Sequence, residues 1–171
     1  MTEILPLYQI PADDVERLLD DAFGADRHGR TAYKLRAGTV AIPSLSFAAV
    51  DGAALVGSLQ SWPVRIETPS GERVPLILVG PVAVSPALQH SGIGRMLMMH
   101  MLRIAEAGEA DALMMIGDPE YYGRFFGFTA DATGGWALPG PVERHRLLAR
   151  VKRTEAVPKV GVIGPDTGRM A

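Results

Sequence analysis

The chain has 171 residues and no cysteine, and its 17 Lys and Arg residues against 19 Asp and Glu residues give a formal net charge of −2. The length suits one domain with a buried core. The charge balance argues against a general nucleic-acid binder, which needs clustered cations, and the lack of cysteine excludes disulfides, cysteine-ligated metals and a cysteine nucleophile.

Neither a targeting segment nor a membrane span is expected. Residues 1–14 lack the basic start and long apolar core of a signal peptide. The longest apolar stretch, around residues 76–84, is far shorter than the ~20 residues that cross a bilayer. We therefore expect a cytoplasmic protein with neither a membrane nor a nucleic acid as its partner.

The first half of the chain mixes patterns typical of strands and of helices. Alternating apolar runs predict three strands, at residues 4–10, 46–50 and 53–62. An apolar face that repeats every three to four residues predicts a helix over 11–23, which Gly24 ends. A second, short helix is expected within 26–36. Asp51-Gly52 joins two of the strands and is typical of a type I′ hairpin turn.

The second half predicts a strand–helix–strand unit followed by shorter elements. These are a long strand over 74–84, a helix over 92–107, a buried strand over 113–116, a short helix over 119–126 and a last strand over 144–151. The order predicts a mixed α/β fold. We assign residues 1–151 to a single domain and residues 152–171 to a C-terminal extension, which its glycines suggest is irregular.

The strand over 74–84 contains Gly80-Pro81, which interrupts an otherwise regular pattern. Proline cannot donate a hydrogen bond to a sheet, and glycine often marks a bulge or the close approach of another group. We therefore expect the backbone of Val82, Ala83 and Val84 to be free to bind a ligand.

A glycine-rich loop, Gln89-His90-Ser91-Gly92-Ile93-Gly94, leads into the helix that begins near residue 92. The first amides of a helix point outward and its dipole favours anions, so the loop suits a phosphate, to which Gln89 and Arg95 can add donors. The same spacing also fits a plain loop with Ser91 as the helix cap. A Walker A motif is absent, and Leu97 replaces the third glycine of the dinucleotide fingerprint.

The stretch VAVSPALQHSGIGRML, residues 82–97, resembles the acetyl-CoA-binding motif of the GNAT superfamily of N-acetyltransferases. The element order over residues 4–150 also follows that family. The resemblance implies a single-domain fold whose central mixed, mostly antiparallel sheet has a splayed, bulged strand and flanking helices. It also implies that the backbone of Val82, Ala83 and Val84 binds the pantetheine arm. The pyrophosphate would be held by Gln89, His90, Ser91, Gly92, Ile93, Gly94 and Arg95.

A tyrosine on the short helix over 119–126 is the candidate general acid. The departing CoA thiolate benefits from a proton donor, because a thiol titrates near ~8.5. Many family members have a tyrosine beside the CoA sulfur, four residues before a Gly-Phe pair. Here Tyr122 lies five residues before Gly127, because Phe125-Phe126 resembles a one-residue insertion. The resemblance favours Tyr122, with Tyr121 as the alternate, and we assign no general base.

We expect an enzyme that transfers the acetyl group of acetyl-CoA to a primary amine by direct attack in a ternary complex. The lack of cysteine excludes a cysteinyl acyl-enzyme. A non-catalytic CoA-binding or sensor module with the same fold remains an alternative. No metal is expected, since His100 has no second ligand at a suitable spacing.

The acceptor stays open between a small-molecule amine and a peptide amine. The resemblance places its site in segments 27–33, 60–62 and 134–146, where Tyr33, Trp62 and Trp136 are candidate lining residues or core residues. The protein is expected to be a monomer or a homodimer.

Overall fold

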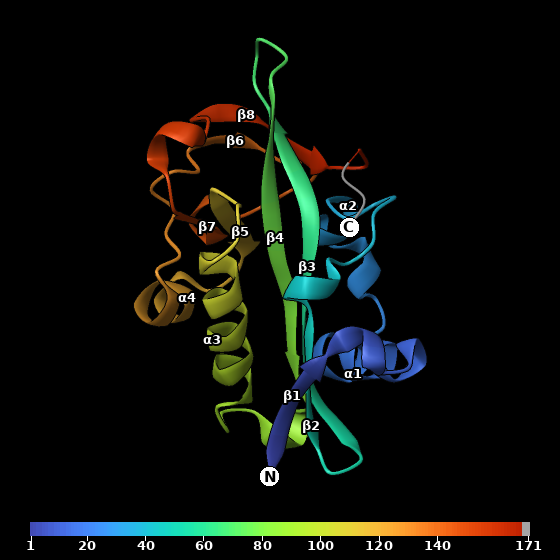
Figure 1. The fold of residues 1–171 in the computed structure, drawn as a ribbon. Helices are drawn as coiled ribbons and strands as arrows, with labels where there is room; N and C mark the ends of the chain where they lie inside the picture. Colours follow the sequence, from blue (N-terminus) through green and yellow to red (C-terminus); the bar gives the residue numbers. More distant parts are fainter. Residues whose placement is uncertain (169–171) are drawn as a thin grey trace. The chain divides into compact units, whose positions relative to one another are not determined.

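The computed structural model describes residues 1–168, in which eight strands and four α-helices are joined by short 3-10 turns (Figure 1). The strands are β1 (Thr2–Pro6), β2 (Phe47–Asp51), β3 (Ala54–Glu67), β4 (Arg73–Val84), β5 (Ala112–Ile116), β6 (Gly135–Ala137), β7 (Leu147–Val151) and β8 (Val160–Pro165). The helices are α1 (Ala12–Phe23), α2 (Thr31–Lys34), α3 (Ile93–Glu106) and α4 (Pro119–Phe126).

The chain folds into two compact units. The first unit comprises residues 1–29, 41–61 and 80–108, and the second comprises residues 30–40, 62–79 and 109 onward. Strands β3 and β4 each run through both units. One boundary between the units falls after Ser61, within β3, and another falls after Val79, within β4.

In the first unit, α1 and α3 cover opposite faces of β2. Phe47 of β2 meets His100 of α3, with ring centroids 4.6 Å apart. Its neighbour Ala48 is buried with Val15, Leu18 and Leu19 of α1. Successive residues of a strand point to opposite faces, so these contacts place the two helices on different sides, as Figure 1 shows. Burying these apolar side chains stabilises the unit.

In the second unit the sheet mixes parallel and antiparallel pairs. Strand β5 pairs antiparallel with β7 and parallel with β4, through Ile77–Leu113 and Leu78–Met114. Strand β8 pairs antiparallel with β3 and parallel with β6. Across the chain the strands are hydrogen-bonded in the order β1-β2-β3-β4-β5-β7. This mixed, mostly antiparallel sheet with flanking helices confirms the expected fold class.

Several elements are shorter or longer than the sequence predicts. The first strand ends at Pro6 rather than at residue 10, because residues 7–9 form a 3-10 turn in which the Ile10 N–H donates to the Leu7 carbonyl at 3.0 Å. The last predicted strand begins at Leu147, since residues 144–146 form a 3-10 turn. Strand β3 continues to Glu67, five residues past its predicted end.

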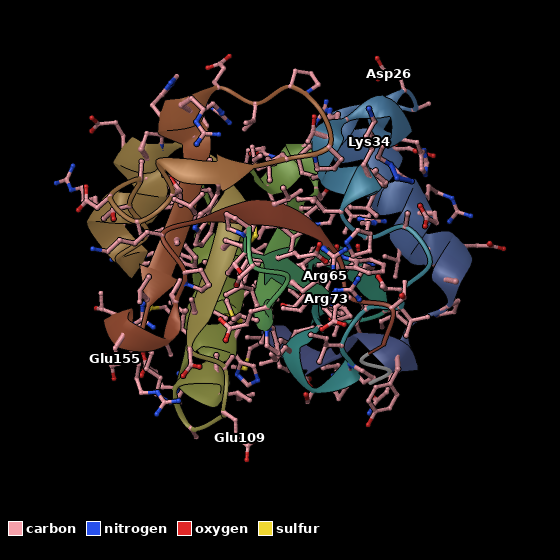
Figure 2. All side chains as sticks on the ribbon, turned by 90° about the horizontal axis from the view of Figure 1, so that it is seen from above. Asp26, Lys34, Arg65, Arg73, Glu109 and Glu155 are labelled. Carbon is pink, nitrogen blue, oxygen red and sulfur yellow. The ribbon has the colours of Figure 1, made fainter. Side chains whose placement is uncertain are left out.

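Strand β8 lies where the sequence predicts an irregular extension after Lys152. The expectation of irregular structure is wrong for residues 160–165, because their glycines serve packing. A Cβ on Gly161 would lie 2.6 Å from Ile66 Cγ1 and 2.7 Å from the Glu67 carbonyl. A Cβ on Gly164 would lie 2.6 Å from Nη1 of Arg65, a side chain labelled in Figure 2. The domain boundary at residue 151 remains a prediction.

No helix within residues 1–168 has the length and apolar character needed to cross a lipid bilayer. Over the same residues, no group of three or more His, Asp or Glu side chains is arranged to hold a metal ion.

Candidate functional site

The end of β4 and the start of α3 pack against each other in the first unit. The backbone departs from extended geometry at Gly80, where φ is +127°, and the parallel pairs that β4 makes with β5 involve Ile77 and Leu78, before this point. A Cβ on Gly94 would lie 3.5 Å from Val84 and 3.9 Å from Val82. The interruption that the sequence predicts at Gly80-Pro81 is therefore present in the backbone.

Successive side chains at the end of β4 point to opposite faces of the strand and so have different surroundings. Ala83 is 1% exposed and packs into the apolar cluster beneath α1, whereas Val82 and Val84 are half-buried and face Gly94. The site is thus formed by the backbone and by short apolar side chains.

Two left-handed residues shape the loop before α3. His90 has φ +67° and Gly92 has φ +92°. Between them, the Ser91 N–H and hydroxyl both donate to the Leu88 carbonyl, at 3.2 Å and 2.5 Å. Because its hydroxyl bonds backward, Ser91 does not cap the helix; Gly92 occupies the cap position without a side-chain hydrogen bond. The expectation that Ser91 caps the helix is therefore wrong.

The start of α3 presents backbone N–H groups. The Met96 N–H donates to the Gly92 carbonyl at 3.0 Å, which is a first-turn bond of α3. The N–H groups of Ile93 and Gly94 precede it and have no acceptor within the helix. Together with the positive end of the dipole of this 14-residue helix, they suit an anionic oxygen group.

Gln89 joins the loop to β4. Its side-chain amide Nε2 donates to the Val84 carbonyl at 3.0 Å. The sequence predicts this amide as a donor to an anion and predicts a free Val84 backbone. In the structure, the two groups satisfy each other, while His90, Ser91 and Arg95 are exposed around the loop.

Gly57 is a residue that the sequence patterns did not single out. A Cβ at this position of β3 would lie 2.7 Å from Ile93 Cγ2 and 3.1 Å from Leu97 Cδ1. Only a residue without a side chain lets the first turn of α3 approach β3 so closely. A glycine inside a predicted strand is the signal that indicates such an approach.

Tyr122 lies in the second unit with its ring against Gly117. A Cβ on Gly117 would lie 2.8 Å from two ring carbons of Tyr122. The Tyr121 ring stands edge-on at 4.9 Å between centroids. Burial, then the nearby Tyr121 and Asp118, raise the pKa of Tyr122 to about 12, although Arg146 opposes the shift. The hydroxyl is therefore protonated at neutral pH.

Helix α4 has a regular start and an irregular C-terminal end. The helix starts with the Asp118 carboxylate accepting the Glu120 N–H at 3.0 Å, and it ends at Gly127, where φ is +75°. The Phe128 N–H reaches back to the Tyr122 carbonyl at 3.2 Å, which closes an unusually wide turn. Tyr122 lies in the first turn of α4, and the insertion that the resemblance suggests remains a prediction.

Tyr121, the alternate candidate, packs among aromatic rings. Its ring centroid lies 5.5 Å from that of Phe125 and 5.6 Å from that of Phe126. These contacts favour a packing role for Tyr121.

The three aromatic residues proposed for the acceptor region separate into two groups. Trp136 is a core residue that is 1% exposed, and its Nε1 donates to the Pro158 carbonyl at 3.0 Å. Tyr33 and Trp62 both contact the Arg36 guanidinium.

Comparison with known proteins identifies the family. The family model described as "Acetyltransferase (GNAT) domain" matches residues 9–130, more than half of the chain. No curated protein matches the chain. Two solved structures are similar over nearly its whole length. The GNAT family N-acetyltransferase YhbS from Escherichia coli, solved with CoA, has a TM-score of 0.72 and 23% identity, covering 97% of this chain and 89% of that one.

A GNAT family acetyltransferase from Brucella melitensis, solved with acetyl-CoA, has a TM-score of 0.67 and 25% identity, covering 97% of this chain and 96% of that one. The match of the family model and the shared fold lead to one conclusion: the chain belongs to the GNAT acetyltransferase family.

Proposed function

We propose that the protein transfers the acetyl group of acetyl-CoA directly to a primary amine. The observation that carries the proposal is the start of α3, where His90 and Gly92 turn the chain and the Ile93 and Gly94 amides precede the first turn. A phosphate group is the ligand that such amides and a helix dipole favour. The similar proteins solved with CoA and with acetyl-CoA support this choice of ligand.

We assign a candidate binding group to the pyrophosphate and to the pantetheine arm of acetyl-CoA. The pyrophosphate is assigned to the loop amides from His90 to Gly94, with Arg95 adding charge. The pantetheine arm is assigned to the backbone of residues 82–84 on β4, apart from the Val84 carbonyl, which accepts from Gln89. Gln89 acts through its bond to the Val84 carbonyl, so it positions the loop.

The reaction needs one proton transfer to sulfur. The neutral amine attacks the thioester carbonyl, the carbon–sulfur bond breaks, the amine loses a proton to solvent, and the thiolate gains one. We assign the donor role to Tyr122, because its raised pKa keeps the hydroxyl protonated at neutral pH. Direct attack is favoured because the chain contains no cysteine to form a thioester intermediate.

The proposal is tested by two measurements on the full-length protein. Isothermal titration should show saturable binding of acetyl-CoA and CoA, and free thiol should appear only when a primary amine is added. Absence of acetyl-CoA binding at high micromolar concentration would overturn the proposal.

A CoA-binding sensor is the second candidate function. The observation that favours it is the sequence of β4, where residues 76–84 include no carboxylate that could serve as a base. Binding of acetyl-CoA without amine-dependent thiol release across a broad amine panel favours the sensor over the enzyme.

A further inference from the structure

Gly117 brings Tyr122 and Arg146 together in the second unit. A Cβ on Gly117 would lie 2.8 Å from two ring carbons of Tyr122, and the Gly117 N–H donates to the Arg146 carbonyl at 3.0 Å. This hydrogen bond continues the antiparallel pairing of β5 with β7, in which Ile116 lies opposite Leu147. Residues opposite each other in an antiparallel pair point to the same face. The Arg146 side chain therefore leaves the backbone on the side where the Tyr122 ring lies.

Arg146 is a half-buried cation whose guanidinium bonds no acceptor among residues 1–168. Arg144, on the same 3-10 turn, has a structural role instead. It donates to three backbone carbonyls, those of Trp136 at 2.7 Å and of Thr133 and Gly134 at 2.9 Å each. Withdrawing a charge from water without a partner is unfavourable. The contacts of the fold thus explain the place of Arg144 but not that of Arg146.

The Tyr122 hydroxyl is also without a hydrogen-bond partner among the described residues, yet it is not enclosed. The described side-chain atoms that are both buried and unpaired all belong to β3. The ring of Tyr122 is therefore packed against Gly117 while its oxygen reaches the accessible surface, where the sulfur of a bound thioester can meet it.

Giving up its proton leaves Tyr122 with a negative charge that needs a partner. Burial, then Tyr121 and Asp118, raise the pKa of Tyr122 to about 12, and Arg146 is the group that lowers it. A thiol titrates near ~8.5, so the transfer of a proton from this phenol to a CoA thiolate runs uphill. A nearby cation reduces that cost, because it attracts the phenolate but not the neutral phenol.

We propose that Arg146 is a positioning residue for the transfer reaction and that its guanidinium pairs with the Tyr122 phenolate formed when the CoA thiolate is protonated. The O–H bond of Tyr122 breaks, the S–H bond of CoA forms, and the negative charge moves from sulfur to the phenolate oxygen. The phenolate then regains a proton from solvent, which has taken one from the amine. This role rests on the proposed function for its reaction, but its spectroscopic test does not.

The first test follows the Tyr122 phenol itself. Tyr122→3,5-difluorotyrosine gives the protein a single ¹⁹F reporter, whose phenol is more acidic and titrates at a pH where the protein stays folded. Combined with this reporter, Arg146→Gln should raise the titration midpoint, because the cation that favours the phenolate is lost. Arg146→Lys keeps a cation and should hold the midpoint near that of wild type. An unchanged midpoint in Arg146→Gln would overturn the pairing.

Arg124→Gln is the matched control for this titration. Arg124 is an exposed cation on the same helix as Tyr122, and it is not among the charges that shift the pKa of Tyr122. The variant should leave both the midpoint and kcat unchanged. A shift as large as that of Arg146→Gln would mean that any cation of this unit has the effect, and would overturn the specific pairing.

The second test measures the contribution of Arg146 to transfer with and without the Tyr122 hydroxyl. Arg146→Gln should lower kcat about tenfold, the value of one charge-assisted hydrogen bond, with little change in KM for acetyl-CoA. Arg146→Lys should recover most of the loss. In the Tyr122→Phe background, Arg146→Gln should cost less than about twofold, because no phenolate forms. Equal losses in both backgrounds would overturn the proposal, since Arg146 would then act on another group.

Two outcomes separate this role from the proposed function. If amines are acetylated but Arg146→Gln changes neither kcat nor the titration of the reporter, the transfer function stands and the role of Arg146 is wrong. If no amine is acetylated, the transfer function fails, and the titration at position 122 alone decides whether Arg146 acts on the phenol.

Discussion

Gly92 combines an unusual backbone angle with a position at the cap of α3. Its φ of +92° belongs to the region that L-residues avoid, and a Cβ there would meet no atom within 4 Å. The space is therefore open to a ligand rather than filled by the protein.

We predict that Gly92→Ala lowers the free energy of unfolding by about 1 kcal/mol and weakens acetyl-CoA binding at least about tenfold. Gly52→Ala is the matched control, because Gly52 has φ +62°, also with no atom near its Cβ, in the turn before β3. It should lose similar stability and keep its affinity. Equal loss of affinity in both variants would contradict the assignment of the loop.

Tyr122 and Tyr121 are neighbours with different surroundings, so phenylalanine at each position tests the proton donor. We expect Tyr122→Phe to lower kcat about a hundredfold, the low end for general acid catalysis, with little change in KM for acetyl-CoA. Tyr121→Phe should keep kcat within about twofold, since its ring contacts persist. The measurement is the steady-state kinetics of the two variants. A large loss of kcat in Tyr121→Phe but not in Tyr122→Phe would assign the role of proton donor to Tyr121.

The raised pKa of Tyr122 also predicts how stability depends on pH. The folded state keeps this proton up to about pH 12, whereas a tyrosine in the unfolded chain releases it near 10. The contribution to stability is complete below pH 10 and is lost as pH rises towards 12. Denaturation of wild type and Tyr122→Phe at several pH values should therefore show a steeper loss of the free energy of unfolding for wild type, by up to about 3 kcal/mol.

At the scale of elements, Gly57 controls how α3 packs on β3. We predict that Gly57→Ala destabilises the protein by about 1–3 kcal/mol, because its methyl group would overlap the branched side chain of Ile93. Displacing Ile93 also moves the amides at the helix start, so acetyl-CoA affinity should fall. Gly29→Ala, whose Cβ would meet no atom within 4 Å, should change neither quantity by more than experimental error.

Sequence patterns located helix α1 well, because its signals are local. Asp13 and Asp14 favour the first turn, and Gly24, with φ +93°, ends the helix. The formation of strand β8 depends instead on contacts with the strands beside it, β3 and β6. Gly161 and Gly164 weaken any local strand signal, yet their lack of side chains lets β8 lie against Ile66 and Arg65.

At the scale of the whole molecule, β8 bears on the proposed domain boundary at residue 151. A chain truncated after Val151 loses the antiparallel pairs between β3 and β8, such as Ile66–Ile163, and the parallel pairs with β6. We expect its thermal midpoint to fall by at least about 5 °C, since several backbone hydrogen bonds and a buried Ile163 are removed. A chain ending at Gly168 keeps β8 and serves as the control. Unchanged melting of the shorter chain would support the boundary.

The sequence by itself determined the mixed α/β order, the glycine-rich loop before α3 and the short helix with Tyr122. These features depend on signals within a few residues: turn-forming glycines, helix ends and apolar periodicity. They also carry the resemblance to the family.

Only the tertiary structure decided which groups meet. It paired the Gln89 amide with Val84, brought Gly57 against Ile93, and stacked the Arg36 guanidinium on the Trp62 ring. Such contacts join residues from different elements, and their energies depend on burial and distance, which no local pattern encodes. The lack of cysteine, by contrast, is a property of the sequence alone, and it excludes a cysteinyl acyl-enzyme whatever the fold.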